Sequence, residues 1–176
     1  MPVFLAILAA AGGLIFWMMR ARNAAHAAQE LVDMAGDLAS AARRFGFRRQ
    51  SNRHPVDVLE EPDVAVAGLG MAMMELGGLP SQEQQNALLI SLQHHLRHDL
   101  QKAQEAQVLG RWLMMQCGGP MPGFSRLARR LAKLGGAEVF DPCMAVLRDV
   151  ITAQTTETSP QQKDALEELA RAFKLR

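Results

Sequence analysis

The stretch PDVAVAGLGMAMMEL, residues 62–76, predicts an apolar α-helix in the middle of the chain. Pro62 suits the first turn, because a helix leaves its first N–H groups unpaired and proline lacks one anyway. Gly68 and Gly70 are small enough to let another segment pack closely, and Gly77-Gly78 ends the helix. One apolar stripe recurs at helical spacing: Val66, Leu69, Met73 and Leu76. The stretch therefore predicts a helix that buries one face.

Five further helices are expected on the C-terminal side of this one. Ser81, Asp99 and Ser159 stand where helix caps are expected, and a proline follows Ser159 at the first helical position. The expected ranges are about 81–96, 100–116, 124–134, 142–153 and 160–173. No convincing alternating strand pattern occurs, so residues 55–176 are predicted to form an all-α bundle of about six helices.

The composition also favours helix over strand, with eleven Met, no Tyr and 5% aromatic residues. The formal net charge of +1 does not indicate a nucleic-acid partner, and none is expected. The charges are unevenly distributed, however. Residues 1–19 carry none, whereas residues 20–53 carry seven Arg against three acidic residues, a net charge of +4.

The N-terminal run VFLAILAAAGGLIFWMM predicts a membrane anchor. Its seventeen residues would span about 25 Å as a helix, close to the thickness of the hydrocarbon core of a bilayer. Trp17 is expected at the membrane interface, with Arg20 and Arg22 beyond it on the cytoplasmic side. Residues 1–22 are therefore predicted to form a single-pass inner-membrane anchor with the C-terminal domain in the cytoplasm. A cleaved signal peptide is the alternative, although no basic stretch precedes the run.

The anchor is followed by a segment, residues 23–54, that is expected to connect it to the bundle. Residues 23–42 predict a helical stalk, and residues 43–55 predict a basic linker. The linker either lies against anionic lipid headgroups or is simply solvated. Ala9 and Gly13, at small-xxx-small spacing, would allow a homodimer through the anchor.

Two stretches of the bundle align without gaps and indicate an internal pseudo-repeat. They are GGLPSQEQQNAL, residues 77–88, and TTETSPQQKDAL, residues 155–166. Each has a serine, a Gln three residues later and then Ala-Leu, and each follows a helix and a short loop. The Ser and Gln have the spacing of a capping box, in which the two side chains pair with the backbone at the start of a helix.

This duplicated unit, together with the order of the helices, resembles the TerB family of tellurite-resistance-type helical domains over about residues 56–175. Close relatives of that domain occur in membrane-anchored DjlA-type co-chaperones. The sequence His54-Pro55-Val56-Asp57 is not the His-Pro-Asp motif of a J domain, so co-chaperone activity does not follow from the resemblance. The resemblance implies an all-helical domain with a divalent cation near its two loops, and a role in envelope or tellurite-type stress.

The loops of this chain depart from that implied metal site. Leu76-Gly77 and Thr155-Thr156 stand where the family has Asp-Gly, and Gln84 and Gln162 stand where it has later acids. A hard cation needs several oxygen ligands that converge. The remaining candidates for a divalent cation are Glu75 and Glu157 beside the loops, with His94 and His98 as a second pair. The two histidines share a helix face only if the helix continues through them; otherwise they are ordinary surface residues.

The stretch FSRLARRLAKL predicts a helix with one basic face. Arg126, Arg129, Arg130 and Lys133 form this face, which is a candidate surface for lipid headgroups or an acidic partner. The alternative is a solvated outer face of a packed helix. No catalytic motif accompanies it, and neither Cys117 nor Cys143 has a neighbourhood typical of a nucleophile, so an enzyme is not expected.

The sequence therefore predicts a membrane-anchored helical domain that binds or holds a protein partner on the cytoplasmic side of the membrane. The alternative function is a divalent-metal-binding or metal-responsive domain. No cofactor other than that cation is expected.

Overall fold

The computed structural model describes residues 36, 38–46, 52–154 and 157–174, and it confirms the all-α prediction over these residues. Six α-helices follow the N-terminal segment, with no strand among the described residues. They are α2 (Pro62–Leu76), α3 (Gln82–His95), α4 (Leu100–Gln116), α5 (Pro120–Gly135), α6 (Phe140–Thr152) and α7 (Pro160–Ala172). Two 3₁₀ turns, η1 (Pro55–Val58) and η2 (Gly136–Val139), precede α2 and α6 and were not predicted.

The predicted anchor, residues 1–22, lies outside the described residues. The same holds for Trp17, Arg20 and Arg22, and for the Ala9 and Gly13 pair. Within the described ranges, no helix is both long enough and apolar enough to cross a membrane.

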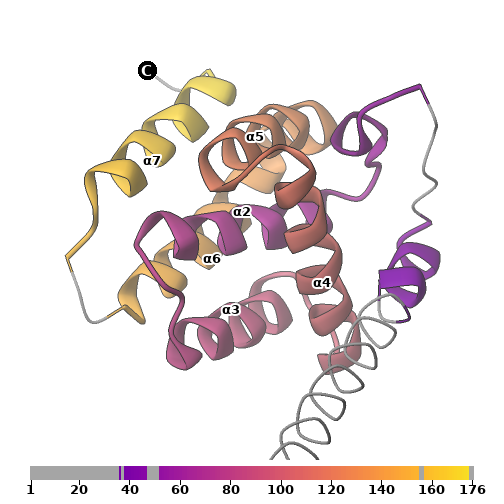
Figure 1. Ribbon diagram of the computed structural model, residues 1–176, viewed down its shortest axis with the longest axis horizontal. Helices are drawn as coiled ribbons and strands as arrows, with labels where there is room; N and C mark the ends of the chain where they lie inside the picture. The colour runs from indigo at the N-terminus through magenta and orange to yellow at the C-terminus, as the bar shows by residue number, and fades with distance from the viewer. Residues whose placement is uncertain (1–35, 37, 47–51, 155–156, 175–176) are drawn as a thin grey trace, which may run out of the picture. The chain divides into compact units, whose positions relative to one another are not determined.

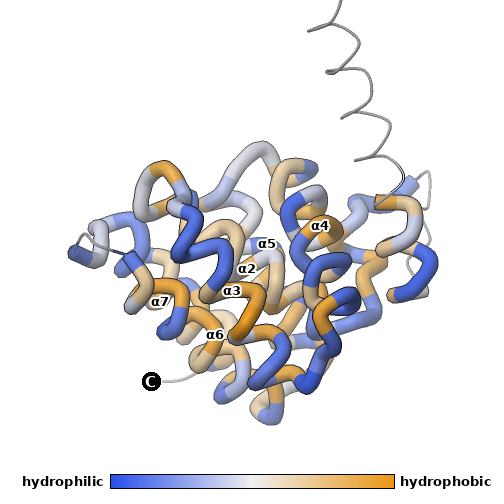
Figure 2. The backbone as a smooth tube through the Cα atoms, turned by 90° about the horizontal axis from the view of Figure 1, so that it is seen from below, coloured by the Kyte–Doolittle hydropathy of each residue, from blue (hydrophilic) through white to orange (hydrophobic). Residues whose placement is uncertain are grey.

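Helix α2 is the axis of the bundle, and each of the other five helices contacts it (Figure 1). Twelve of its fifteen residues are buried, so the prediction of a single buried stripe was too narrow. A helix that is apolar around its whole circumference is stable only when other elements surround it. The surrounding helices, such as α4 and α7, instead alternate between hydrophobic and hydrophilic residues (Figure 2).

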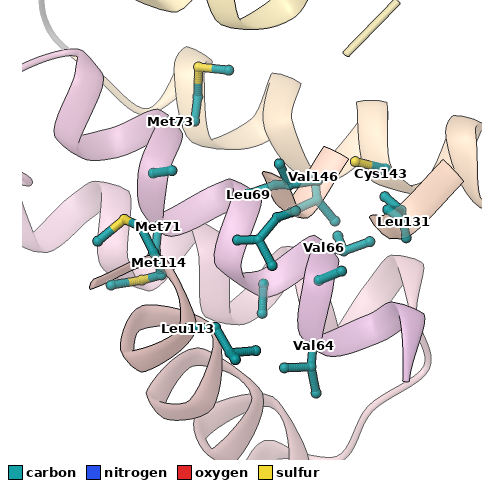
Figure 3. Close-up of a cluster of buried hydrophobic side chains, with 14 of the residues drawn as sticks. Val64, Val66, Leu69, Met71, Met73, Leu113, Met114, Leu131, Cys143 and Val146 are labelled. Carbon is teal, nitrogen blue, oxygen red and sulfur yellow. The ribbon is translucent and has the colours of Figure 1, made fainter. Parts of the chain in front are cut away.

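The core forms where α4, α5 and α6 meet α2 (Figure 3). Its side chains are mostly short or unbranched at Cβ, and these shapes interdigitate closely between helices. The residues labelled in Figure 3 are Val64, Val66, Leu69, Met71 and Met73 of α2, Leu113 and Met114 of α4, Leu131 of α5, and Cys143 and Val146 of α6. Burial raises the pKa of the Cys143 thiol to about 12, which keeps this sulfur an inert part of the core.

Helices α2 and α4 touch through their backbones at Gly68 and Gly110. A Cβ added to Gly110 would lie 2.5 Å from the backbone nitrogen of Gly68 and 2.9 Å from its Cα. A Cβ added to Gly68 would lie 3.1 Å from the carbonyl oxygen of Gly110 and 2.8 Å from a methyl group of Leu127. The expectation that Gly68 permits close packing is confirmed, and the segment that uses this space is α4.

Most helix boundaries agree with the sequence, but α5 begins at Pro120 rather than near residue 124. Gly118-Gly119-Pro120 separates two helices, and its proline is the first residue of the second one. Proline is favoured at that position because the first N–H groups of a helix have no partner within it. Helix α6 likewise begins at Phe140, two residues before the expected Pro142.

The second of two compact units starts at Leu38, so the described residues from Leu38 to Gly46 belong to the same unit as the bundle. The helical conformation extends to Arg44, whose Nε lies 2.5 Å from Oε2 of the buried Glu105. Phe45 is 6% exposed, with its ring centroid 6.3 Å from that of His98 and 5.7 Å from Nζ of Lys102. The first residues of the predicted basic linker are therefore packed against the start of α4.

The contact between α2 and α4 predicts that Gly110→Ala destabilises the fold. The added methyl group would meet the backbone of Gly68, which cannot rotate away as a side chain can. We expect a loss of about 2 kcal/mol or more in the free energy of unfolding, as for overpacked cores, despite the better helix propensity of alanine.

Chemical denaturation of the purified full chain measures this loss. Gly36→Ala is the matched control, because Gly36 is helical and an added Cβ there meets nothing within 4 Å. Equal stability of the two variants would contradict the close contact.

Candidate functional site

Both halves of the pseudo-repeat form the predicted capping box. The Ser81 hydroxyl accepts a hydrogen bond from the Gln84 backbone N–H at 3.2 Å, and the Gln84 side chain accepts one from the Ser81 N–H at 3.1 Å. The corresponding distances between Ser159 and Gln162 are 3.1 and 2.9 Å. The local geometry of the two helix starts is therefore the same.

The second capping box also binds the C-terminal end of α2. Gln162 is fully buried, and its Nε2 donates to the carbonyl of Met73 at 3.0 Å and to Oε1 of Gln154 at 2.9 Å. The Ser159 hydroxyl donates to the carbonyl of Leu76 at 2.9 Å. The last carbonyls of a helix have no partner within it, so these donors satisfy groups that would otherwise face the interior unpaired. The two loops of the pseudo-repeat are thereby brought together at the end of α2.

The first capping box has no such long-range bonds among the described residues, and the loop before it borders a groove. The groove has a volume of about 340 Å³ and lies between this loop, α2, α3, α4 and the start of α5. Its apolar walls are Met71, Leu79, Pro80 and Pro120. Its polar side chains are Glu75, Gln85 and Arg111. We call this set the Leu79 groove.

Leu79 is the most exposed large apolar side chain among the described residues, at 98%. It stands between Gly78, whose φ of 128° is accessible mainly to glycine, and Pro80, whose φ is fixed by its ring. Proline also restricts the residue before it, so Pro80 limits the backbone conformations of Leu79. Met115, 61% exposed, follows Arg111 by one turn of α4 and adds a second exposed apolar side chain.

The Leu79 groove contains one acid and one base that are not paired with each other. Glu75 and Arg111 line the same groove, yet neither has an ion pair within the parts of the chain that the structure describes. Arg111 is exposed and Glu75 is half-buried. The groove therefore offers apolar contact together with one charge of each sign.

The candidate metal ligands lie in different environments. Glu75 borders the Leu79 groove, and Glu157 is exposed just before α7. His94 is exposed, with its ring edge-on to that of His95 at a centroid distance of 4.7 Å. Among the described residues, no group of three or more His, Cys, Asp or Glu side chains is placed to hold a metal ion. The cation site therefore stays a prediction.

The two histidines are separated by the end of α3. The helix stops at His95, and Arg97 adopts a φ of 55°, so the chain turns before it reaches His98. His98 is buried, and its Nε2 lies 2.7 Å from Oδ2 of Asp63 in the first turn of α2. Burial raises the pKa of Asp63, but the hydrogen bond and charge of His98, with the nearby Lys102, outweigh this and hold that pKa below its ordinary value. His98 thus fastens the start of α4 to the start of α2.

The predicted basic face of α5 is divided by the structure. The Arg126 guanidinium binds Asp57 through two hydrogen bonds, of 3.1 and 2.5 Å, and these hold the pKa of that carboxyl below its usual value. Arg130 donates to the carbonyl of Leu59 through Nε at 2.7 Å and through Nη2. Arg129 and Lys133 are exposed. Half of the predicted partner surface therefore holds the segment around η1 in place, and the other half faces solvent.

One cluster contains the residue types of a serine nucleophile but not its geometry. The Ser91 hydroxyl donates to Oδ2 of Asp149 at 2.6 Å, and Nε2 of His95 lies 3.0 Å from the same oxygen. In a catalytic triad the histidine lies between serine and aspartate, so that it can accept the proton of the hydroxyl. Here the serine is 2% exposed and gives its hydrogen bond to the carboxylate directly. The cluster ties α3 to α6.

A second pair, Cys117 and His54, is also arranged as a structural contact. His54 Nδ1 accepts the N–H of Val56 at 3.3 Å, which places the proton of the neutral ring on Nε2. That Nε2 lies 3.2 Å from the carbonyl of Gln116 and 3.9 Å from Sγ of Cys117. A protonated nitrogen cannot accept the thiol proton, and burial raises the pKa of Cys117. The sulfur is therefore not activated.

Sequence reasoning singled out Glu75 but missed the rest of the Leu79 groove. A leucine between glycine and proline in a loop is the one local signal that was present. Arg111 gave no signal, because its place beside Glu75 depends on how α4 crosses α2. Comparisons with protein-family models, with curated proteins and with solved structures find no match for this chain.

The difference between the two capping boxes predicts unequal costs for the same substitution. Gln162→Ala leaves the buried carbonyl of Met73 without its partner, at about 1–3 kcal/mol, and also removes the hydrogen bond to the half-buried amide of Gln154. Gln84→Ala removes only the local cap, which is worth about 1 kcal/mol.

The two variants form a matched pair, because Gln84 and Gln162 are the same residue at corresponding positions of the two halves of the pseudo-repeat. We expect Gln162→Ala to lower the thermal midpoint of the full chain clearly more than Gln84→Ala does. Equal midpoints would show that the buried amide of Gln162 does not hold α7 to α2.

Proposed function

We propose that this chain is a non-catalytic helical binding module that contacts another protein surface through the Leu79 groove. The observation that carries the proposal is the 98% exposure of Leu79 beside a groove with apolar walls. Leaving a leucine in water has a cost of the order of 1.5–3 kcal/mol relative to its burial, and a contact that covers the side chain recovers it. A single exposed leucine would be unremarkable, but here it borders a groove that also has apolar walls.

The composition of the groove supports a protein partner rather than a small molecule. Met and Arg side chains are enriched at protein interfaces; Arg111 lines the groove, and the exposed Met115 follows it by one turn of α4. A site for a small ligand normally encloses it, whereas this groove is open to solvent along one side. The backbone of Leu79 is already restricted by the proline that follows it, so less conformational freedom is lost when it binds.

The membrane anchor of residues 1–22 is part of this proposal. It would hold the module at the cytoplasmic face of the inner membrane, where the exposed Arg129 and Lys133 of α5 suit anionic lipid headgroups. A role in envelope or tellurite-type stress belongs to the same proposal and rests on the TerB resemblance alone.

Photo-crosslinking in intact cells tests the proposed contact. A photoreactive residue placed at Gln85, which lines the groove and is exposed, should give a discrete crosslinked product from the full chain. Leu79→Ser should abolish the product, because it removes the apolar side chain that the partner covers.

Ile90→Ser is the matched control, since Ile90 is an apolar side chain on α3 that is 63% exposed and does not line the groove. It should leave the product unchanged. A product that survives Leu79→Ser, or the absence of any product from Gln85, would contradict the proposed function.

A further inference from the structure

We propose that the surface bound by the Leu79 groove is the same groove on a second copy of this chain, related by a two-fold axis. This inference rests on the proposed function and names the partner. In a two-fold interface the same surface of both copies meets. If one residue contacts a second residue on the other copy, the same contact occurs again with the two copies exchanged, so the surface must be complementary to itself. The groove has the parts that such an interface needs.

The first of these parts is an apolar projection beside an apolar hollow. Leu79 projects into solvent, and Met71 and Pro120 form part of the wall next to it. When two copies meet face to face about an axis between these features, each Leu79 enters the hollow of the other copy. Two leucines and two hollows are then removed from water together, which doubles the gain from one patch.

The second part is the pair of opposite charges. A groove for an acidic or a basic segment is expected to carry charges of one sign, whereas this one carries both Glu75 and Arg111. Neither has an ion-pair partner among the residues the structure describes. The two-fold arrangement places Arg111 of each copy against Glu75 of the other, so that two ion pairs form and every charge is compensated. A self-complementary charge pattern favours a second copy over a partner of one sign.

The groove is lined by eight residues, whereas a standard interface has about 20–30 residues a side, so the contact is expected at the weak end of specific interfaces. Exposed Met115 extends the apolar surface along α4 and adds to the contact. Two copies anchored in one membrane, as proposed above, would meet at a raised effective concentration, so even a weak affinity would be enough for the dimer to form there. In solution the dimer is expected to form over a range of about tens to hundreds of micromolar, as for weak transient complexes.

Sedimentation equilibrium of the full chain in density-matched detergent, with charge-reversal variants, tests the inference. Arg111→Glu and Glu75→Arg each place two like charges opposite each other across the axis. Each should raise the dissociation constant of the dimer by about tenfold or more, within the range measured for close interfacial charge pairs. The double variant restores opposite charges and should return the dissociation constant to within about threefold of the original.

Two control variants separate this interface from other contacts. Arg148→Glu reverses an exposed arginine of α6 outside the groove and should leave the dissociation constant unchanged. Gly13→Leu removes the small-residue pair of the expected anchor and should leave the effects of the groove variants unchanged.

A wild-type chain that stays monomeric over the whole range, or a double variant no better than the single ones, would overturn the inference. The crosslink from Gln85 then separates the two proposals. A product with twice the mass of the chain supports both, and a product with a different protein overturns the second copy but keeps the binding function. The absence of any product overturns both.

Discussion

The backbones of α2 and α4 touch at Gly68 and Gly110, and the other main features of the fold depend on this contact. It allows α2 to lie in the middle of the bundle with helices on all sides, which its apolar circumference requires. It also positions the Leu79 groove. Met71 and Glu75 follow Gly68 on the same face of α2, at i+3 and i+7, while Arg111 directly follows Gly110. A wider separation of the two helices would therefore move both charged side chains of the groove apart.

The end of α2 is where the two halves of the pseudo-repeat take different roles. Both loops lead into the same capping box, but the Gln162 amide points inward and satisfies a carbonyl of α2. The loop before Ser81 instead presents Leu79 to solvent. Gln162 gives the second loop a neutral hydrogen-bond donor. An amide N–H is suited to a helix carbonyl and needs no cation to compensate it.

The sequence predicted the features that depend on neighbouring residues. The caps at Ser81 and Ser159 follow from bonds within four residues, so their boundaries agree with the structure. The basic face of α5 was only half correct, because Arg126 and Arg130 bind groups 69 and 71 residues away. The burial of Phe45 was missed for the same reason, since its contacts lie on α4 and just before it. No local pattern distinguishes an arginine that will pair from one that will stay in solvent.

The Leu79 groove shows the same limit at the candidate site. Glu75 was singled out as a metal ligand from its place before the loop, whereas its surroundings are apolar walls and an arginine. The position of Glu75 beside Arg111 depends on how α4 crosses α2, which no local sequence pattern indicates.

The central claim is that Leu79 is covered by another copy of the chain. Methyl-resolved NMR of the full chain at increasing concentration tests it directly, because Leu79 and Ile90 are both exposed and only Leu79 lines the groove. The account predicts that the Leu79 methyl signals shift and broaden between tens and hundreds of micromolar, while those of Ile90 stay in place. Leu79 signals that do not change over that range would contradict it.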